Sequence, residues 1–174
     1  MESNYCPVCG NRLNRKEIGD EGFVPYCSVC ERAYFDNPIP CVIVCCVNEA
    51  EECIVLKQSY GWTDQWAFIA GFLQHGETIE EAARREVKEE VGLEGLVAVY
   101  IASYPFKIKD QIMLGVLVRA NKRDFVLSEE LNVAAWVPLT EVTHYLREGS
   151  IALKHAKNTL AYLKNSANNI EDCR

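Results

Sequence analysis

The stretch GFLQHGETIEEAARREVKEEVGL, residues 71–93, combines the signals of one well-delimited helix with a high density of acidic residues. Thr78 is a candidate N-cap, and Glu81 three residues later completes a capping box. Gly92 supplies the C-terminal stop, because glycine readily adopts the left-handed conformation that ends helices. The segment therefore predicts a helix over residues 79–91.

Several acidic residues of this helix fall on its apolar side. At about 100° per residue, its apolar side chains share an arc of about 180°. They are Ile79, Ala82, Ala83, Val87 and Val91. Glu86 and Glu90 fall inside the arc, and Glu89 lies at its edge. The opposite side, which we expect to face water, carries Glu81, Arg84, Arg85 and Lys88.

Carboxylates three and four residues apart on an apolar face need a partner. They repel one another, and they lose hydration when they are buried. The pattern favours Mg²⁺ or Mn²⁺, since hard cations take oxygen ligands and neutralise several carboxylates together. The alternative is a solvated acidic helix stabilised by ion pairs such as Arg85–Glu89.

The same stretch resembles the signature of the Nudix hydrolase superfamily. The matching positions are Gly71, Glu77, Arg85-Glu86-Val87, Glu89-Glu90 and Gly92-Leu93. The resemblance implies an α/β (α+β) fold, a Nudix-type α/β/α sandwich with a mixed sheet, over roughly residues 38–165. It also implies Mg²⁺- or Mn²⁺-dependent hydrolysis of a nucleoside diphosphate linked to another moiety.

The resemblance gives the metal ligands of such a site. Glu86 and Glu90 would be the principal ligands, and Glu89 a further ligand or a water-binding group. The backbone carbonyl of Ala70 or Gly71 would join them. Metal ions held in this way bridge diphosphate oxygens, offset developing charge and activate a water for attack.

The resemblance also gives a role to the remaining charged positions of the signature. Glu77 would pair with Arg85 and brace the preceding loop against the helix. We therefore expect the catalytic set to be Glu77, Arg85, Glu86, Glu89 and Glu90.

Two C-x-x-C pairs near the N-terminus predict a second metal site. Cys6, Cys9, Cys27 and Cys30 have the spacing of a closed tetrahedral zinc site, whose role is structural. The alternatives are two disulfides or a redox dithiol. Residues 1–36 carry four basic against six acidic side chains, which is a poor footprint for nucleic-acid phosphate. This segment is therefore interpreted as a small zinc ribbon.

The composition changes near Asn37-Pro38, where a second domain is expected to begin. The predicted divisions are a zinc ribbon over 1–36, a hydrolase domain over 37–165 and a polar tail over 166–174. Short apolar, β-branched runs predict strands over 39–47, 53–58, 66–72, 96–104, 112–120 and 133–137. Helical spacing predicts helices over 140–147 and 151–163, the second with Ser150 at its N-cap.

A four-cysteine ribbon before this domain resembles the NADH pyrophosphatases and shorter relatives that act on FAD or ADP-ribose. The similarity extends through YFDNPIPCVIV, AGF and SIALKHA. Those enzymes tend to carry a glutamate, as a further metal ligand, three residues before a tryptophan. The corresponding position before Trp136 is Val133, and the nearby Glu129 and Glu130 are the candidates to take its place.

The same resemblance gives candidate substrate-binding residues. Phe35 and Phe72 match positions that flank the substrate, and SIALKHA contributes Ala152. The segment SYPFKIKDQIM departs from the longer proline-rich motif of the NADH pyrophosphatases. It retains Ser103, Phe106 and Met113. We expect these side chains to contact a dinucleotide or ADP-ribose.

The composition bounds the partners and the compartment. A net charge of −7 argues against a general binder of nucleic acids or anionic membranes, and no apolar run is long enough to span a bilayer. Nine cysteines without a recognisable signal peptide indicate a reducing compartment, and we expect a cytoplasmic protein.

The expected partner is a small nucleotide, and a homodimer is compatible with the sequence. Two alternatives stay open: a non-catalytic nucleotide-sensing module, and removal of a nucleotide cap from RNA.

Overall fold

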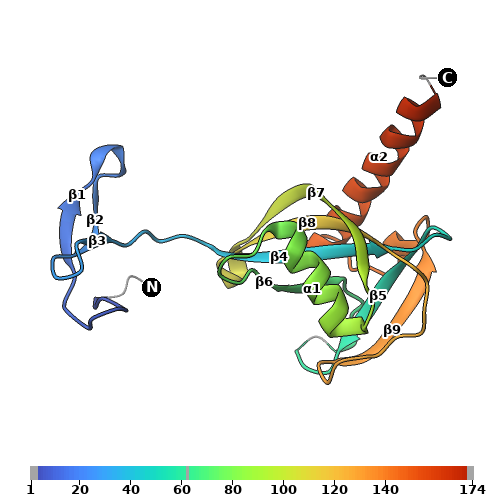
Figure 1. Cartoon of the computed structure of the whole chain (residues 1–174), viewed down its shortest axis with the longest axis horizontal. Helices are drawn as coiled ribbons and strands as arrows, with labels where there is room; N and C mark the ends of the chain where they lie inside the picture. The colour runs from blue at the N-terminus through green and yellow to red at the C-terminus, as the bar shows by residue number, and fades with distance from the viewer. Residues whose placement is uncertain (1–3, 62, 172–174) are drawn as a thin grey trace. The chain divides into compact units, whose positions relative to one another are not determined.

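The computed structural model describes residues 4–61 and 63–171, the last of them, 167–171, by their backbone alone. The chain divides into two compact units, Met1–Pro38 and Ile39–Arg174 (Figure 1).

The N-terminal unit is a three-stranded antiparallel sheet in the order β1-β2-β3. Its elements are β1 (Asn14–Glu17), η1 (Gly19–Glu21), β2 (Phe23–Cys27) and β3 (Arg32–Ala33). Among residues 4–38 only Cys6, Val24 and Cys27 are buried apolar side chains. So small a core stabilises little by itself, and units of this size usually need a metal or disulfides.

In the described part of the second unit, six strands form one mixed sheet with the main order β7-β8-β4-β5-β9. The strands are β4 (Ile39–Val47), β5 (Glu52–Gln58), β6 (Ile69–Phe72), β7 (Gly95–Phe106), β8 (Gln111–Ala120) and β9 (Leu131–Pro138). β6 pairs with β4, which is parallel to β8 and antiparallel to β5 and β6. The mixed sheet agrees with the predicted fold class.

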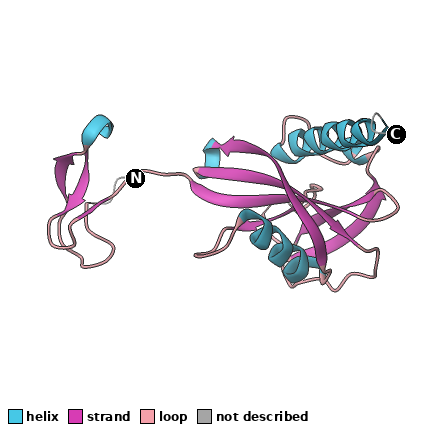
Figure 2. Ribbon diagram, turned by 45° about the horizontal axis from the view of Figure 1, so that its top comes forward, coloured by secondary structure: helices cyan, strands magenta, loops and turns pink. Residues whose placement is uncertain are grey.

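Strand β4 divides the core in two because both of its faces are buried. Its odd-numbered residues from Cys41 to Val47 pack with α2 (Ile151–Glu171). Its even-numbered residues from Val42 to Cys46 pack with α1 (Ile79–Val91). The helices therefore cover opposite faces of the sheet (Figure 2), and the predicted α/β/α sandwich is confirmed. Burial on both faces explains the continuous apolar sequence IPCVIVCCV.

The predicted helix over 140–147 is wrong. Only a short 3₁₀ turn, η3 (Val142–His144), forms there, and Leu146 then makes a parallel bridge to Trp66. Val142 and Leu146 are both buried in the core on the α2 side of the sheet. Three β-branched residues within Thr140–Thr143 have modest helix propensity, and packing against the sheet decides their conformation.

Helix α2 begins as predicted and ends later than predicted. The Ser150 hydroxyl accepts a hydrogen bond from the Leu153 N–H at 3.1 Å, which confirms the N-cap. The helix then continues to Glu171, across much of the predicted polar tail over 166–174. Neither glycine nor proline occurs between residues 151 and 171, so no local signal stops it.

A buried polar network fastens α2 to the sheet. His155 is fully buried, and its Nε2–H donates to the Val116 carbonyl at 3.1 Å. Its Nδ1 therefore accepts from the Tyr104 hydroxyl at 3.3 Å, which in turn accepts from the Asn158 amide at 3.0 Å. Burial lowers the pKa of His155 to about 4, so the ring is neutral. A Cβ at Gly115 would lie 2.6 Å from Nδ1, so only glycine leaves room for the ring.

Replacement of Tyr104 by phenylalanine should destabilise the second unit. The variant leaves Nδ1 of His155 without its donor and the Asn158 amide without its acceptor. We expect the free energy of unfolding to fall by about 1–3 kcal/mol, measured by urea denaturation. Tyr100→Phe, at an exposed position of the same strand, is the control and should change it by less than about 0.5 kcal/mol. Equal effects of the two substitutions would contradict the network.

Candidate active site

Helix α1 begins and ends at the residues that the sequence predicts. The Thr78 hydroxyl accepts from the Glu81 N–H at 3.2 Å, and the Glu81 carboxylate accepts from the Thr78 N–H at 2.8 Å. Gly92 ends the helix in the left-handed conformation, with φ of 74°. The capping box and the glycine stop fix the register of the helix, and therefore the direction of each glutamate.

Two glutamates of α1 are buried among apolar residues. Glu86 and Glu90 are each 8% exposed, whereas the Glu89 side chain is 57% exposed. Between them along the helix lies the fully buried Val87. The apolar face predicted for this helix is thus the buried one, and it carries two carboxylates.

Gly71 makes the close contact between α1 and β6 sterically feasible. A Cβ on Gly71 would lie 1.9 Å from Oε1 of Glu86, so any other residue would displace this carboxylate. The glycine therefore brings a carboxylate directly against the strand. This contact places Glu86 beside Ala70 and Gly71, the two candidates for a backbone ligand.

Arg85 lies with the carboxylates, so its predicted position on the water-facing side of the helix is wrong. Its side chain is only 20% exposed, and it bonds to Glu77 at 2.6 Å, Glu86 at 2.7 Å and Glu89 at 2.9 Å. It also donates to the Phe72 carbonyl at 2.9 Å. A long arginine side chain can cross a helix surface, which a wheel of Cα directions does not represent. The expected Glu77–Arg85 pair is present.

Glu90 is the least compensated carboxylate of the group. Its Oε2 is buried and has no hydrogen-bond partner among the described residues. Burial first, and then the charge of Glu86, raise the pKa of Glu90 to about 8, although the Ala70 backbone N–H acts in the opposite direction. Burial also raises the pKa of Glu86. Two buried carboxylates that repel each other, one of them with an unpartnered oxygen, fit a site for Mg²⁺ or Mn²⁺, because these cations prefer oxygen ligands.

A cavity of about 560 Å³ adjoins this acidic group. Ala70 and Gly71 form part of its wall, and five aromatic side chains line it. The aromatic residues of the wall are Tyr60, Trp66, Phe68, Phe72 and Phe106. Its volume and its mostly apolar lining are typical of small-molecule sites.

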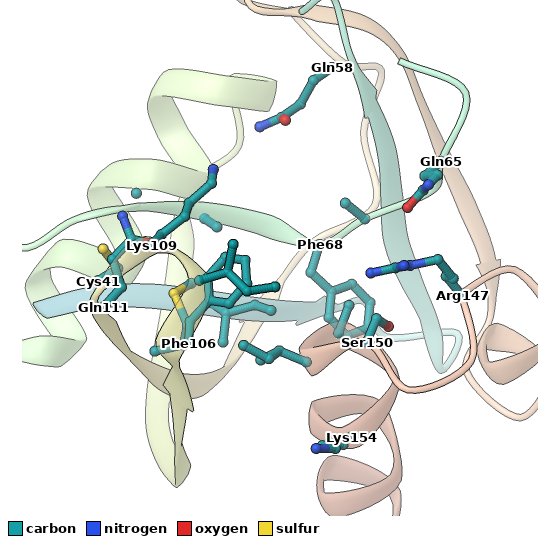
Figure 3. Close-up of a pocket in the computed structure, with 18 of the residues that line it drawn as sticks. Cys41, Gln58, Gln65, Phe68, Phe106, Lys109, Gln111, Arg147, Ser150 and Lys154 are labelled. Carbon is teal, nitrogen blue, oxygen red and sulfur yellow. The ribbon is translucent and has the colours of Figure 1, made fainter. Parts of the chain in front are cut away.

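Basic side chains lie on two sides of the cavity. Figure 3 shows Lys109 beside Cys41 on one side, and Arg147 and Lys154 on the other, where α2 begins. Lys107 is a further basic lining residue. The cavity therefore combines surfaces for a base or another flat ring with charges that attract phosphate.

The structure brings together most of the residues proposed to bind substrate. Phe72, Phe106, Met113 and Ala152 line the cavity. Ser103 is exposed on β7 and does not belong to the described wall. Phe35 is an exposed residue of the N-terminal unit. Its contact with substrate stays a prediction.

The sequence did not single out several residues of the wall. They are Gln58, Gln65, Phe68, Arg147 and Lys154. Arg147 fell in a segment that was wrongly predicted as helical, and Lys154 resembles any exposed lysine of a helix. Only the spacing of SIALKHA places Lys154 one turn after the N-cap of α2, and so near the cavity.

The four ribbon cysteines converge on one point. Their sulfur atoms all lie within 4.8 Å of one another, and all four are free thiols. Cys9 Sγ is 3.5 Å from Cys27 Sγ, whereas a disulfide needs about 2.05 Å. The Tyr34 hydroxyl, 3.0 Å from Cys6 Sγ, lowers the pKa of that thiol to about 6. Four sulfur donors in this arrangement fit a tetrahedral zinc ion.

The NUDIX domain family model matches residues 37–157, a range that contains α1, the acidic group and most of the cavity wall. The chain belongs to the Nudix family. The predicted family is thereby confirmed.

Curated relatives extend the likeness beyond the Nudix domain. The chain is 30% identical over 162 residues to the NAD-capped RNA hydrolase NudC of Photobacterium profundum, covering 92% of this chain and 59% of that protein. It is 34% identical over 149 residues to the chloroplastic Nudix hydrolase 19 of Arabidopsis thaliana, covering 80% of this chain and 33% of that protein. The chain thus spans little more than half, or less, of these relatives.

Solved Nudix structures share the fold. A NUDIX hydrolase from Nitrosomonas europaea superposes with a TM-score of 0.70 at 21% identity, covering 89% of each chain. An Ap4A hydrolase from C. elegans gives 0.60 at 19% identity, covering 72% of this chain and 98% of that one. No helix within the described residues has the length and apolar character to cross a membrane.

Elemental analysis should find about one zinc per chain in the purified protein. Removal of zinc by a chelator should unfold residues 1–38, since the buried apolar side chains described there are so few. Loss of NMR dispersion confined to this unit would be the readout. A metal-free protein with a folded ribbon, or a Cys6–Cys9 or Cys27–Cys30 disulfide in mass spectrometry, would refute the zinc site.

Glu90 should make the protein less stable as pH rises when no divalent cation occupies the acidic group. Folding raises its pKa from 4.5 to about 8, so its stabilising contribution is complete below pH 4.5 and is lost as pH rises through 8. We expect Glu90→Gln to show a smaller decline than wild type in urea denaturation across this range. Glu89→Gln, at the exposed neighbouring carboxylate, should decline like wild type. If the free energy of unfolding declined with pH equally in wild type, Glu90→Gln and Glu89→Gln, Glu90 would not be the cause of the decline.

Proposed function

We propose that the protein hydrolyses the diphosphate linkage of a nucleoside diphosphate derivative. The substrate class is a dinucleotide such as NADH or FAD, or ADP-ribose. The observation that carries the proposal is the orphaned, buried Glu90 carboxylate beside Glu86, at the edge of an aromatic cavity with basic walls. A nucleotide diphosphate offers rings for that cavity and phosphates for its charges.

The acidic group would hold the divalent cation. Glu86 and Glu90 are the principal ligands in this proposal, with Glu89 as a further ligand and a carbonyl of Ala70 or Gly71 completing the set. When bound, Mg²⁺ or Mn²⁺ would offset charge on the diphosphate oxygens and make a water molecule more acidic. The carboxylates would in turn lose the repulsion that raises the pKa of Glu90.

Arg85 positions the acidic group from the side. It binds Glu77, Glu86 and Glu89 at once, and so fixes the loop before α1 relative to the helix. Two nitrogen atoms of the guanidinium contact the Glu77 carboxylate, which is the bidentate geometry that holds an arginine in one orientation. Arg85 thus keeps Glu86 in place while Oε2 of Glu90 has no partner among the described residues.

The cavity would orient the rest of the substrate. Phe68, Phe72 and Phe106 offer flat apolar surfaces, on which a base or an isoalloxazine ring can stack. Lys109 lies beside Cys41 (Figure 3), which pairs with Phe72 of β6, so Lys109 would meet a diphosphate bound near the cation. Lys107 also lines the cavity. Aromatic walls on several sides of the linkage would also limit the access of bulk water.

Removal of an NAD cap from RNA is a second candidate function. Relatives named NAD-capped RNA hydrolase NudC match over 90% or more of this chain, and the chemistry at the diphosphate would be the same. The net charge of −7 weighs against RNA as a general ligand, but the basic residues beside the cavity lessen that argument. A purely sensing role is less well supported, because a sensor needs no complete set of carboxylates.

The metal, the compartment and the zinc complete the proposal. We assign Mg²⁺ or Mn²⁺ to catalysis and Zn²⁺ to the ribbon, where a closed sulfur site leaves no position for substrate. Eight free cysteines among the described residues suit a reducing compartment such as the cytoplasm.

A panel of substrates tests the proposed function. NADH, NAD⁺, FAD, ADP-ribose and an NAD-capped RNA would each be incubated with zinc-loaded protein and Mg²⁺ or Mn²⁺, and the products separated by chromatography. We expect kcat/KM for NADH, FAD and ADP-ribose to agree within about tenfold, because SYPFKIK has fewer prolines to pre-set the cavity for one ligand. A preference for NADH of about a hundredfold or more would contradict this breadth.

Glu90→Gln is the variant for the same assay. It should lower kcat at least about a hundredfold while leaving the circular dichroism spectrum unchanged. Glu80→Gln, on the first turn of α1, is the control and should retain activity. Near-normal turnover in Glu90→Gln would remove the basis of the proposed function.

A further inference from the structure

The buried side chain of His155 lies directly behind an aromatic residue of the cavity wall. Its ring meets the ring of Phe68, the residue before β6, edge to face, with 6.0 Å between the ring centroids and 89° between the planes. Phe68 is among the side chains that line the cavity (Figure 3), and it is only 3% exposed. The imidazole therefore supports this part of the wall from the core side.

Strands β7 and β8 hold the same imidazole by its two nitrogen atoms. The Val116 carbonyl of β8 accepts from Nε2–H at 3.1 Å, and the Tyr104 hydroxyl of β7 donates to Nδ1 at 3.3 Å. Tyr104 pairs with Met113 across these strands, and Met113 lines the cavity. The orientation of the ring is thus set by strands that also contribute to the wall.

Helix α2 carries His155 one turn after a residue of the wall. Ala152 and Lys154 both line the cavity at the start of this helix. Asn158, in the next turn, donates to the Tyr104 hydroxyl at 3.0 Å, so the first turns of α2 are bonded to β7. Three parts of the wall, from the segment before β6, the β7–β8 pair and α2, consequently meet at one imidazole.

The space around the imidazole is closed, so the ring is held in one position. A Cβ at Gly115 would lie 2.6 Å from Nδ1 of His155 and 2.9 Å from Cε2 of Tyr104. His155 itself is 0% exposed. A wall residue that packs against such a fixed ring keeps its plane before any ligand arrives. Pre-organisation of this kind strengthens binding, because less freedom is lost when the ligand binds.

We propose that His155 is a positioning residue of the cavity, which holds the Phe68 ring in the plane that a flat ring of the substrate contacts. The inference rests on the proposed function, because it takes the cavity to be the nucleotide site. Aromatic rings attract one another in specific geometries, so the affected ligands are those that carry a base or another flat ring. A histidine that only stabilised the core would affect ligands with and without such a ring alike.

AMP and ribose 5-phosphate are suitable probes, since they differ in whether the sugar carries adenine. Met113 is one of two methionines in the sequence and lines the cavity, so isotope labelling of methionine methyl groups places an NMR reporter in the wall. His155→Gln removes the ring but offers an amide donor and acceptor in place of its nitrogen atoms. In zinc-loaded protein it should weaken AMP binding about fivefold or more, and ribose 5-phosphate binding less than about twofold.

Val118→Ala is the matched control for a general loss of stability. Val118 is fully buried on β8, but in the core on the α1 side of the sheet. The substitution should lower the free energy of unfolding and leave AMP affinity within about twofold of wild type. Unchanged AMP affinity in His155→Gln, equal losses for the two ligands, or an equal loss of AMP affinity in Val118→Ala would overturn the proposal.

Tyr104→Phe decides the question if His155→Gln does not fold. This variant retains both rings and removes only the hydroxyl that orients Nδ1. It should weaken AMP binding about threefold and leave ribose 5-phosphate binding unchanged. In that case, equal AMP affinities in Tyr104→Phe and wild type would overturn the positioning role.

Failure of the proposed function has a different result. If AMP left the Met113 signal of wild type unchanged, the nucleotide cavity would be refuted, and the inference with it. If AMP bound with the expected dependence on His155 but no diphosphate derivative were cleaved, the proposed reaction would fail while the role of His155 stood.

Discussion

The contact between α1 and β6 forces two carboxylates into an apolar environment, and much of the second unit is arranged around this constraint. Glu86 lies where only a glycine at position 71 leaves room for it, and Glu90 follows one turn later. Arg85 compensates the first carboxylate, whereas Oε2 of the second has no partner among the described residues. When Glu90 is ionised, above its raised pKa of about 8, the structure therefore holds an unfavourable buried charge that a bound cation would compensate.

The doubly buried strand β4 determines where that ligand can meet a substrate. Its two faces support separate cores, one under each helix, so α1 and α2 cannot contact each other through the sheet. Residues of β4 and β6 line the cavity, and its wall includes Gly71 near α1 and Ala152 at the start of α2. In the proposed function, the acidic group and the basic α2 side of the cavity would consequently meet different parts of one substrate molecule.

Local signals account for what the sequence predicted well. Thr78, Glu81 and Gly92 specify the limits of α1 by contacts within a few residues, so the direction of Glu86 and Glu90 could be read from spacing alone. The strands came from short β-branched runs, and Ser150 marked the start of α2. These features depend little on the rest of the fold.

Features that depend on distant contacts were missed. The path of Arg85 is set by Glu77 and the Phe72 carbonyl, which belong to the preceding loop and strand. The segment around Val142 and Leu146 takes its conformation from the core and from Trp66, against a helical spacing. Arg147 joins the cavity only because of that conformation, and the ring contact between Phe68 and His155 joins residues from distant parts of the chain.

The described cysteines of the two units differ in how accessible their thiols are to oxidants and electrophiles. Cys45, Cys46 and Cys53 are 0% exposed, and burial and neighbouring thiols raise the pKa values of Cys45 and Cys46. Thiols of this kind are poor nucleophiles and meet few reagents. The ribbon presents Cys9 at the surface and Cys30 partly so. Among the described cysteines, peroxide or electrophile damage would thus begin at those of the ribbon, and the buried thiols of β4 and β5 would outlast them.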